Sequence, residues 1–157
     1  MTRVLAISST GGHWVQLNRL MPAFEGCEMH WACTSPDHET RLRVAAKRLG
    51  QQVISYTPIT DANRKTKLRL VKQMLEIAAL LVRVRPDVVV STGASAGFFA
   101  IRLGKLMGAR TCWIDSIANG DELSLSGEKA GPHADLFLTQ WPDVAKPGGP
   151  LYRGAVL

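Results

Sequence analysis

Two short glycine segments of the chain have residue types that suit phosphate binding. The first, Ser8-Ser9-Thr10-Gly11-Gly12-His13, separates an apolar run at 4–7 from an amphipathic segment. Glycine lets the main chain approach a ligand closely, and the free N–H groups at the start of a helix favour an anion. We expect a phosphate-binding role for Ser9, Thr10, Gly11 and Gly12. The alternative is that the segment forms only a tight turn.

The second segment, Thr92-Gly93-Ala94-Ser95, follows an apolar run at 87–91 in the same way. If both runs are parallel strands, both segments lie at the carboxyl edge of one sheet, where α/β proteins bind ligands. We expect phosphate binding here too, by Thr92, Gly93, Ala94 and Ser95, again with a tight turn as the alternative. The first segment lacks the G-x-G-x-x-G pattern, and the chain has no G-x-x-x-x-G-K-[ST] pattern. Both absences argue against a dinucleotide site or a P-loop.

Two side chains near these segments can take part in proton transfer. His13 lies at a predicted helix start, where the helix dipole favours the neutral imidazole as a base or a hydrogen-bond donor. Capping or packing is the alternative for this histidine. Asp115 ends the apolar run at 110–114, and a polar segment at 116–122 follows it. A cap on that following turn is the alternative for Asp115.

The elements that must position these residues alternate along the chain. The expected strands lie at 4–7, 28–33, 52–56, 87–91, 110–114, 136–138 and 151–156. The expected helices lie at 13–24, from 35 or 37 to 49, at 63–84 and from about 94 to 107. This order predicts an α/β fold with one Rossmann-like domain over residues 1–157, a parallel sheet with helices on both faces.

The composition fits a globular protein with anionic partners. Hydrophobic residues make up 46% of the 157 residues, and the formal net charge is +6. A basic chain favours phosphates, acidic membranes or nucleic acid, but no nucleic-acid motif is present, so we expect no nucleic-acid partner. The three cysteines match no zinc or redox spacing. We expect them to be small buried apolar residues in a reducing cytosol.

The predicted helix at 63–84 has a basic first half and an apolar second half. The basic residues are Arg64, Lys65, Lys67, Arg69 and Lys72. Such a pattern is typical of a helix that docks on an anionic membrane surface. A core helix with a solvated basic end is the alternative. No segment has the roughly 18 apolar residues that a bilayer span needs, so we expect a peripheral contact.

Five motifs follow one another along the chain. They are Ser8-Ser9-Thr10-Gly11-Gly12-His13, Val90-Ser91-Thr92-Gly93, Trp113-Ile114-Asp115-Ser116, Leu123-Ser124-Leu125-Ser126-Gly127 and Thr139-Gln140-Trp141-Pro142. Together they resemble the membrane-associated subunit of the split UDP-N-acetylglucosamine transferases of dolichol-linked oligosaccharide synthesis, and its bacterial exopolysaccharide and capsule relatives. The resemblance extends from Val4 to Leu157. The chain departs from the eukaryotic subunit in having Asp115 in place of a glutamate and in showing no N-terminal anchor segment.

The resemblance implies the N-terminal, acceptor-side lobe of a GT-B glycosyltransferase that is divided between two chains. The second chain would bind most of the UDP-sugar, and the acceptor would be a polyprenyl-diphosphate-linked sugar. Inverting transfer needs a base for the acceptor hydroxyl, for which Asp115 is the first choice and His13 the second. Ser116 and Asn119, in the loop after Asp115, are further expected substrate contacts.

No metal or other cofactor is expected, because the chain has no Asp-x-Asp pair and no cluster with metal-ligand spacing. The implied location is cytoplasmic, on the inner face of the plasma membrane. Two other functions stay open, a non-catalytic scaffold that recruits a catalytic partner to the membrane and a stand-alone nucleotide-binding protein. Trp141 and Pro142 are expected either at the partner interface or in packing.

Overall fold

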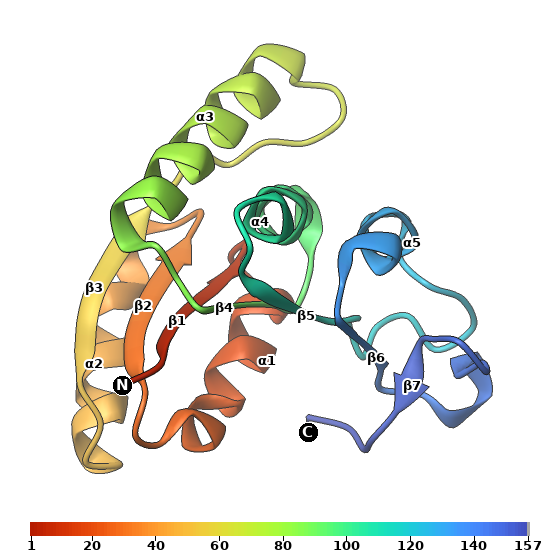
Figure 1. The fold of residues 1–157 in the computed structure, drawn as a ribbon, viewed down its shortest axis with the longest axis horizontal. Helices are drawn as coiled ribbons and strands as arrows, with labels where there is room; N and C mark the ends of the chain where they lie inside the picture. Colours follow the sequence, from red (N-terminus) through yellow and green to blue (C-terminus); the bar gives the residue numbers. More distant parts are fainter. Residues whose placement is uncertain (157) are drawn as a thin grey trace.

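The computed structural model describes residues 1–156 and has one sheet of seven parallel strands (Figure 1). The strands are β1 (Arg3–Ser8), β2 (Glu28–Cys33), β3 (Val53–Pro58), β4 (Val88–Ser91), β5 (Arg110–Ile114), β6 (Leu136–Thr139) and β7 (Leu151–Tyr152). Their order is β3-β2-β1-β4-β5-β6-β7, so the strand order reverses between β1 and β4. Ligands of open α/β sheets bind beside the carboxyl ends of the strands at such a switch point.

Helices cover both faces of the sheet (Figure 1). They are α1 (Gly12–Arg19), α2 (Glu39–Arg48), α3 (Lys67–Val84), α4 (Ala94–Leu106) and α5 (Leu125–Ala130), with 3-10 turns at Met21–Phe24, Pro36–His38, Gly131–His133 and Pro142–Val144. Successive side chains of a strand point to opposite faces. In β1, Leu5 and Ile7 therefore join the core under α3 and α4, and Val4 and Ala6 join the core under α1 and α2. The predicted Rossmann-like fold is confirmed.

Three predicted boundaries are wrong for local reasons. The helix expected at 63–84 begins only at Lys67, because residues 63–66 form a hydrogen-bonded turn. The helix expected at 13–24 ends at Arg19, and Pro22 belongs to a separate 3-10 turn. The strand expected to stop at 56 continues through Pro58, which is tolerated because β3 is an edge strand.

Two elements near the C-terminus also differ from the prediction. The strand expected at 151–156 is only Leu151–Tyr152. The short helix α5 was not predicted, although Ser124 caps it by accepting a hydrogen bond from Gly127 N. With only six residues, α5 is too short for helical periodicity to mark it in the sequence.

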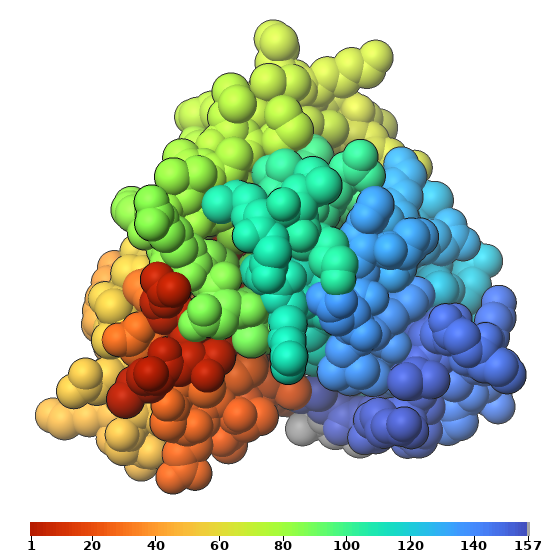
Figure 2. Space-filling view, viewed as in Figure 1, coloured from red at the N-terminus to blue at the C-terminus, as the bar shows by residue number. Residues whose placement is uncertain are grey.

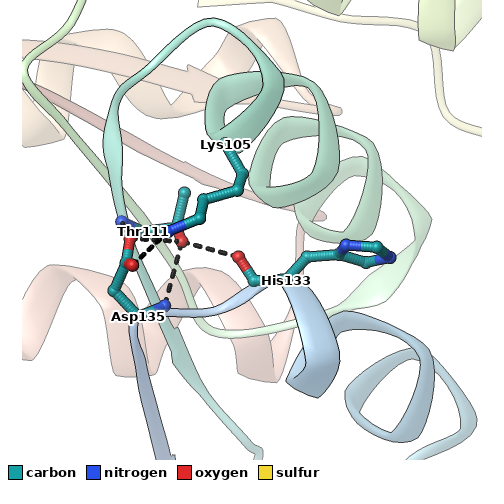
Figure 3. Close-up of polar contacts among 4 residues, drawn as sticks. All are labelled: Lys105, Thr111, His133 and Asp135. Atoms are coloured by element: carbon teal, nitrogen blue, oxygen red, sulfur yellow. Dashed lines mark hydrogen bonds and ion pairs between the residues drawn. The ribbon is translucent and has the colours of Figure 1, made fainter.

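A polar cluster joins β5 and β6 at their amino ends (Figure 3). Thr111 N donates to Asp135 Oδ2 at 2.8 Å, and Thr111 Oγ1 donates to the main-chain oxygen of His133 at 2.8 Å. Lys105, near the end of α4, forms an ion pair with Asp135. The hydrogen bonds from Lys105 and Thr111 hold the pKa of the Asp135 carboxyl below its usual value. The cluster fixes α4 against the strands at the edge opposite the glycine segments.

Candidate active site

His13 is the last residue of the first glycine segment, and its side chain lies against the second segment, at the carboxyl edge of β1 and β4. Its Nδ1 atom is 2.9 Å from the main-chain oxygen of Thr92, and Thr92 Oγ1 donates to the main-chain oxygen of His13 at 2.7 Å. A carbonyl oxygen can only accept, so Nδ1 of the neutral imidazole carries the hydrogen. The other ring nitrogen, Nε2, then holds a lone pair and can accept a proton. The ring itself is half-buried.

Gly93 provides the surface on which the imidazole lies. A Cβ atom at position 93 would be only 2.3 Å from His13 Nδ1, so any side chain there would displace the ring. Gly93 has φ +144°, which L side chains rarely adopt, and its N–H donates to Ser91 Oγ at 3.2 Å. Gly93 and Thr92 are both buried. Both main-chain and side-chain groups of Thr92 bond to His13, and the Gly93 N–H bonds to Ser91, so phosphate binding by these two residues stays a prediction.

The rest of the second segment faces α3 and not the first segment. Ser95 Oγ donates to Gln73 Oε1 at 2.8 Å and lies 3.0 Å from the main-chain oxygen of Ala62. Ala94 is half-buried and has φ +66°, a strained value for a residue other than glycine. The hydroxyl of Ser95 thus faces acceptors within the protein, and its expected substrate contact stays a prediction.

The first glycine segment is open to a ligand. A Cβ atom at Gly11 would meet nothing within 4 Å, and one at Gly12 would meet only Gln16 Nε2, at 4.0 Å. Both glycines are exposed, and α1 begins at Gly12, so the first N–H groups of that helix have no intrahelical partner. The main chain here has the geometry that the predicted phosphate site requires.

Two neighbouring residues hold this segment from the side of β2. Thr10 N donates to Thr34 Oγ1 at 2.9 Å, and Thr10 Oγ1 lies 2.8 Å from His38 Nε2. The His38 ring is stacked on Trp14 of α1, with ring centroids 5.0 Å apart. Ser9 is half-buried, and its main-chain oxygen accepts from Ser8 Oγ at 3.0 Å. The N–H and hydroxyl of Thr10 therefore face the protein, which leaves Gly11 and Gly12 as the part most open to an anion.

Asp115 is buried, with 1% of its surface exposed, and its carboxylate accepts four hydrogen bonds. Oδ1 accepts from Trp113 Nε1 at 3.0 Å and from Ser124 Oγ at 2.6 Å. Oδ2 accepts from Ser124 N at 2.9 Å and from Asn119 Nδ2 at 3.1 Å. A carboxylate has about four acceptor positions, and all are taken here. The carboxylate therefore connects β5 to the loop at Asn119 and Ser124, and the acceptor positions that a base would use are occupied.

Ser116 and Asn119 also face the protein. Ser116 Oγ accepts from Gln16 Nε2 at 3.1 Å and from Ala118 N at 3.2 Å. Asn119 N donates to Ser116 O at 3.0 Å, and its side chain is bound to Asp115. Both residues lie beside Asp115 as expected and hold the loop by these bonds, while their substrate contact stays a prediction.

Sequence reasoning missed two buried glutamines that connect the elements around this loop. Gln16 Oε1 accepts from Ile117 N at 3.1 Å and from the side chain of Gln140. Gln140 Nε2 also donates to Asp115 O at 3.0 Å, and Gln140 Oε1 accepts from Val156 N at 2.7 Å. The signal in the sequence that could have pointed to these two residues is their position. Gln16 occurs one turn after Gly12, and Gln140 belongs to the last of the five motifs.

Trp141 covers the same loop. Its Nε1 donates to the main-chain oxygen of Ile117 at 2.7 Å, and a Cβ atom at Gly120 would lie 3.2 Å from its ring. The side chain is nevertheless 38% exposed. Of the two expected roles, packing is therefore present, and the partner interface stays a prediction.

Helix α3 combines exposed cations with exposed apolar residues. Arg64 and Lys65 lie in the turn before the helix, and Lys67, Arg69 and Lys72 lie on it, all exposed. We call Leu68, Val71, Leu75 and Val82 the apolar α3 face, because their spacing places them on one side of the helix and all are at least half exposed. The N-terminal end of α3 protrudes at the top of Figure 2. Among residues 1–156, no helix is long and apolar enough to cross a bilayer.

The Rossmann-like fold of this chain is similar to part of larger solved proteins with GT-B glycosyltransferase-type folds. The crystal structure of MurG from Acinetobacter baumannii matches with a TM-score of 0.75 and 14% identity, over 97% of this chain and 45% of MurG. A putative UDP-N-acetylglucosamine 2-epimerase from Listeria monocytogenes matches with a TM-score of 0.64 and 12% identity, over 88% of this chain and 39% of the epimerase. The chain thus spans less than half the length of either protein.

In sequence, the chain is similar to one kind of transferase subunit. It is 26% identical over 166 residues to the UDP-N-acetylglucosamine transferase subunit ALG14 of Eremothecium gossypii, covering 91% of this chain and 74% of that protein. It is 38% identical over 65 residues to the corresponding subunit of Schizosaccharomyces pombe, covering 38% of this chain and 31% of that protein. No family model matches the chain.

Proposed function

We propose that this chain is the acceptor-side subunit of a two-chain inverting glycosyltransferase. It would transfer a sugar from a UDP-sugar such as UDP-N-acetylglucosamine to a polyprenyl-diphosphate-linked acceptor in polysaccharide synthesis. The similarity to proteins named as transferase subunits supports the transferase activity and the need for a partner chain. The chain matches less than half of MurG, and the proposal assigns the donor-binding lobe to the partner chain, so that the chain alone would have little activity.

One observation carries the chemical part of the proposal, the hydrogen bond between His13 Nδ1 and Thr92 O. It leaves Nε2 as the acceptor of the neutral ring, which is the protonation state that a general base needs. In the proposed step, the acceptor oxygen bonds to the anomeric carbon while the bond from that carbon to UDP breaks. The hydroxyl proton passes to His13 Nε2, and UDP leaves with the electron pair. His13 replaces Asp115 as our first choice of base.

The first glycine segment supplies the anion contact of the proposal. The exposed N–H groups at the start of α1 would bind phosphate oxygens of UDP or of the lipid diphosphate, with the helix dipole adding favourable charge. These groups lie next to His13 in the chain, so one ligand could contact both. The proposal assigns no metal to this chain.

Helix α3 supplies the membrane contact of the proposal. The apolar α3 face would enter the boundary between head groups and acyl chains, and the five cations around it would meet anionic head groups. A lipid-linked acceptor requires such a peripheral location, on the cytoplasmic side of the plasma membrane.

The test compares two histidine variants in the complex with the candidate donor-binding chain. His13→Gln should lower kcat by about 10²–10⁴-fold, as expected for loss of a general base, with little change in KM. His133→Gln is the matched control. That side chain contacts Arg102, near the polar cluster at the amino ends of β5 and β6, so the change should leave turnover unchanged. Full turnover by His13→Gln would instead support the non-catalytic scaffold. Strong turnover by the isolated chain would contradict the two-chain enzyme.

A further inference from the structure

We infer that Gln73 and Ser95 are positioning residues for His13, although neither touches it. The inference rests on the proposed function, because it assigns a purpose to the tautomer that His13 needs as a base. It joins three observations: a fully buried glutamine on α3, a strained turn at the start of α4, and an imidazole that lies on that turn.

The side chain of Gln73 is buried where α3 otherwise buries apolar residues. The other buried positions of the helix are Ile77, Leu80, Leu81 and Val84. A buried amide is costly unless both its oxygen and its nitrogen are hydrogen-bonded. Here Gln73 Nε2 donates to Thr60 O at 2.8 Å, and Gln73 Oε1 accepts from Ser95 Oγ at 2.8 Å. An apolar residue would fill the same space but could not hold Ser95.

Ser95 follows directly after the strained part of the second glycine segment. Ala94 has φ +66° and Gly93 has φ +144°, both outside the regions that most residues adopt. Ala94 is the strained residue of this turn, since glycine adopts such angles freely, and a strained residue persists only when its surroundings hold it. The hydrogen bond from Ser95 to Gln73 restrains the turn from its α3 side. The bond from Gly93 N to Ser91 Oγ restrains it from the β4 side.

The turn has a direct effect on His13. Thr92 O accepts the hydrogen of Nδ1, and the open Cα surface of Gly93 lies against the ring. A shift of the turn by about 1 Å would break the first contact, because a hydrogen bond weakens steeply beyond about 3.5 Å. The two ring nitrogens would then be free to exchange roles, since the bond made by one nitrogen decides the protonation of the other. Gln73 and Ser95 thus keep the lone pair on Nε2.

The experiment measures the tautomer of His13 by NMR of ¹⁵N-histidine-labelled full-length chain at neutral pH. The chain has only four histidines, and His13→Gln assigns the signal. The wild type should show the Nδ1–H tautomer. Ser95→Ala should lower the ratio of Nδ1–H to Nε2–H by about fivefold, as expected for loss of one typical hydrogen bond. Gln73→Leu should lower it less, because Ser95 Oγ can still donate to Ala62 O at 3.0 Å. The double variant should add little to Ser95→Ala, because Gln73 acts on the turn through Ser95.

Two controls separate positioning from a general loss of structure. Ser95→Thr keeps the hydroxyl and should keep the wild-type tautomer. Gln51→Leu removes a partly buried glutamine that lies far from both glycine segments and donates to Met21 O at 3.0 Å. This change should also leave the His13 tautomer unchanged. An unchanged tautomer ratio in folded Ser95→Ala would overturn the inference, even if Gln73→Leu fails to fold.

The readout needs no donor, acceptor or partner chain. If the tautomer shifts as expected but the complex shows no transferase activity, the proposed function is wrong and the positioning stands. If the complex is active and the tautomer does not respond to Ser95→Ala, the positioning is wrong and the proposed function stands.

Discussion

His13 and Thr92, 79 residues apart in the sequence, exchange two hydrogen bonds. The side chain of each residue donates to the main-chain oxygen of the other, at 2.9 Å from His13 Nδ1 and at 2.7 Å from Thr92 Oγ1. These two hydrogen bonds connect the two glycine segments to each other across the switch point of the sheet. The roles of the segments differ, since the first segment is open to solvent and the second is a support for the imidazole.

The different roles of the two segments can be separated by a pair of alanine substitutions. Gly12→Ala should leave the fold and the His13 tautomer unchanged, because the new Cβ atom meets only Gln16 Nε2, at 4.0 Å. It should weaken binding of a phosphate ligand, since a side chain would stand where the ligand approaches the main chain. Thermal unfolding and titration with UDP or a lipid diphosphate would measure both effects. Unchanged affinity would mean that the segment is only a turn.

Gly93→Ala should change the fold and the His13 tautomer more than ligand binding, the opposite of Gly12→Ala. Its Cβ atom would lie 2.3 Å from His13 Nδ1, so the ring must move and the bond to Thr92 O must break. We expect loss of the Nδ1–H tautomer, a fall in kcat and a lower melting temperature, with ligand affinity at Gly12 less affected. Retention of the wild-type tautomer in Gly93→Ala would contradict this arrangement.

Asp115→Asn tests whether Asp115 is a structural residue. An amide nitrogen cannot accept, so the variant would lose up to two of the four hydrogen bonds and place a donor against donors. We expect a loss of about 2–3 kcal/mol in the free energy of unfolding, measured with urea. Asp121→Asn, an exposed change in the same loop, is the control and should be neutral. A stable but inactive Asp115→Asn would restore Asp115 as the base.

Membrane docking by α3 predicts binding to vesicles that contain phosphatidylglycerol and not to neutral vesicles. Each cation near an anionic surface contributes about 1 kcal/mol, so replacing Lys65, Lys67 and Arg69 with glutamine should weaken binding more than tenfold at low salt. Stability should hardly change, because exposed charges contribute little to folding. The matched control replaces three exposed cations of α2, Arg41, Lys47 and Arg48, and so changes the net charge equally. An equal loss of vesicle binding in both triple variants would mean that binding depends on the net charge of the chain and not on the position of the cations on α3.

The apolar half of the docking surface needs its own test. Leu68 and Leu75 are 88% and 60% exposed, so changing both to serine should leave the fold intact. The change should weaken vesicle binding even at a salt concentration that screens the cations. Binding of Leu68→Ser/Leu75→Ser that matches the wild type at high salt would exclude insertion of the apolar α3 face.

We expect Asp135, in the polar cluster at the amino ends of β5 and β6, to make a pH-dependent contribution to the stability of the fold. Its pKa is lowered in the fold, first by the hydrogen bond from Lys105, so the carboxylate stabilises the protein at pH 7. This contribution is lost as the pH falls through the lowered pKa, below about 4. Asp135→Asn should cost about 0.5–1 kcal/mol at pH 7, a small value because the ion pair is partly exposed to solvent. Urea unfolding from pH 7 to 3.5 should show the difference shrinking, and a constant difference would refute the assignment.

The alternation of apolar runs and helical periodicity predicted the fold because both signals are local. β2 and β5 have the predicted bounds, since each is a short run of buried residues between turn residues. Pro58 was misjudged because its tolerance depends on β3 being at the edge of the sheet, which is a property of the whole topology. Local pattern also cannot reveal α5, which depends on a cap at Ser124 more than on periodicity.

The site is predicted less completely, because the partners of its polar groups depend on how loops fold and on residues distant in the sequence. The strand-end position of Asp115 suggests a base, but three of its donors come from Asn119 and Ser124, which only the fold of the following loop brings to it. The segment at Gly93 looks like a phosphate loop until His13, on another element, covers it. The position of His13 near the start of a helix at the carboxyl edge follows from local pattern, while its tautomer depends on a carbonyl 79 residues away.

The two edge strands of the sheet have a consequence for assembly. An exposed edge strand offers unpaired main-chain groups to other chains, which leads to strand addition and aggregation. In this sheet, one edge strand, β3, ends in Pro58, which has no N–H to donate, and the other, β7, has only two residues. Both edges are therefore poor templates for a further strand. The sheet edges of this chain therefore disfavour joining copies of itself strand to strand, and a neighbour is better placed to bind through side chains and loops.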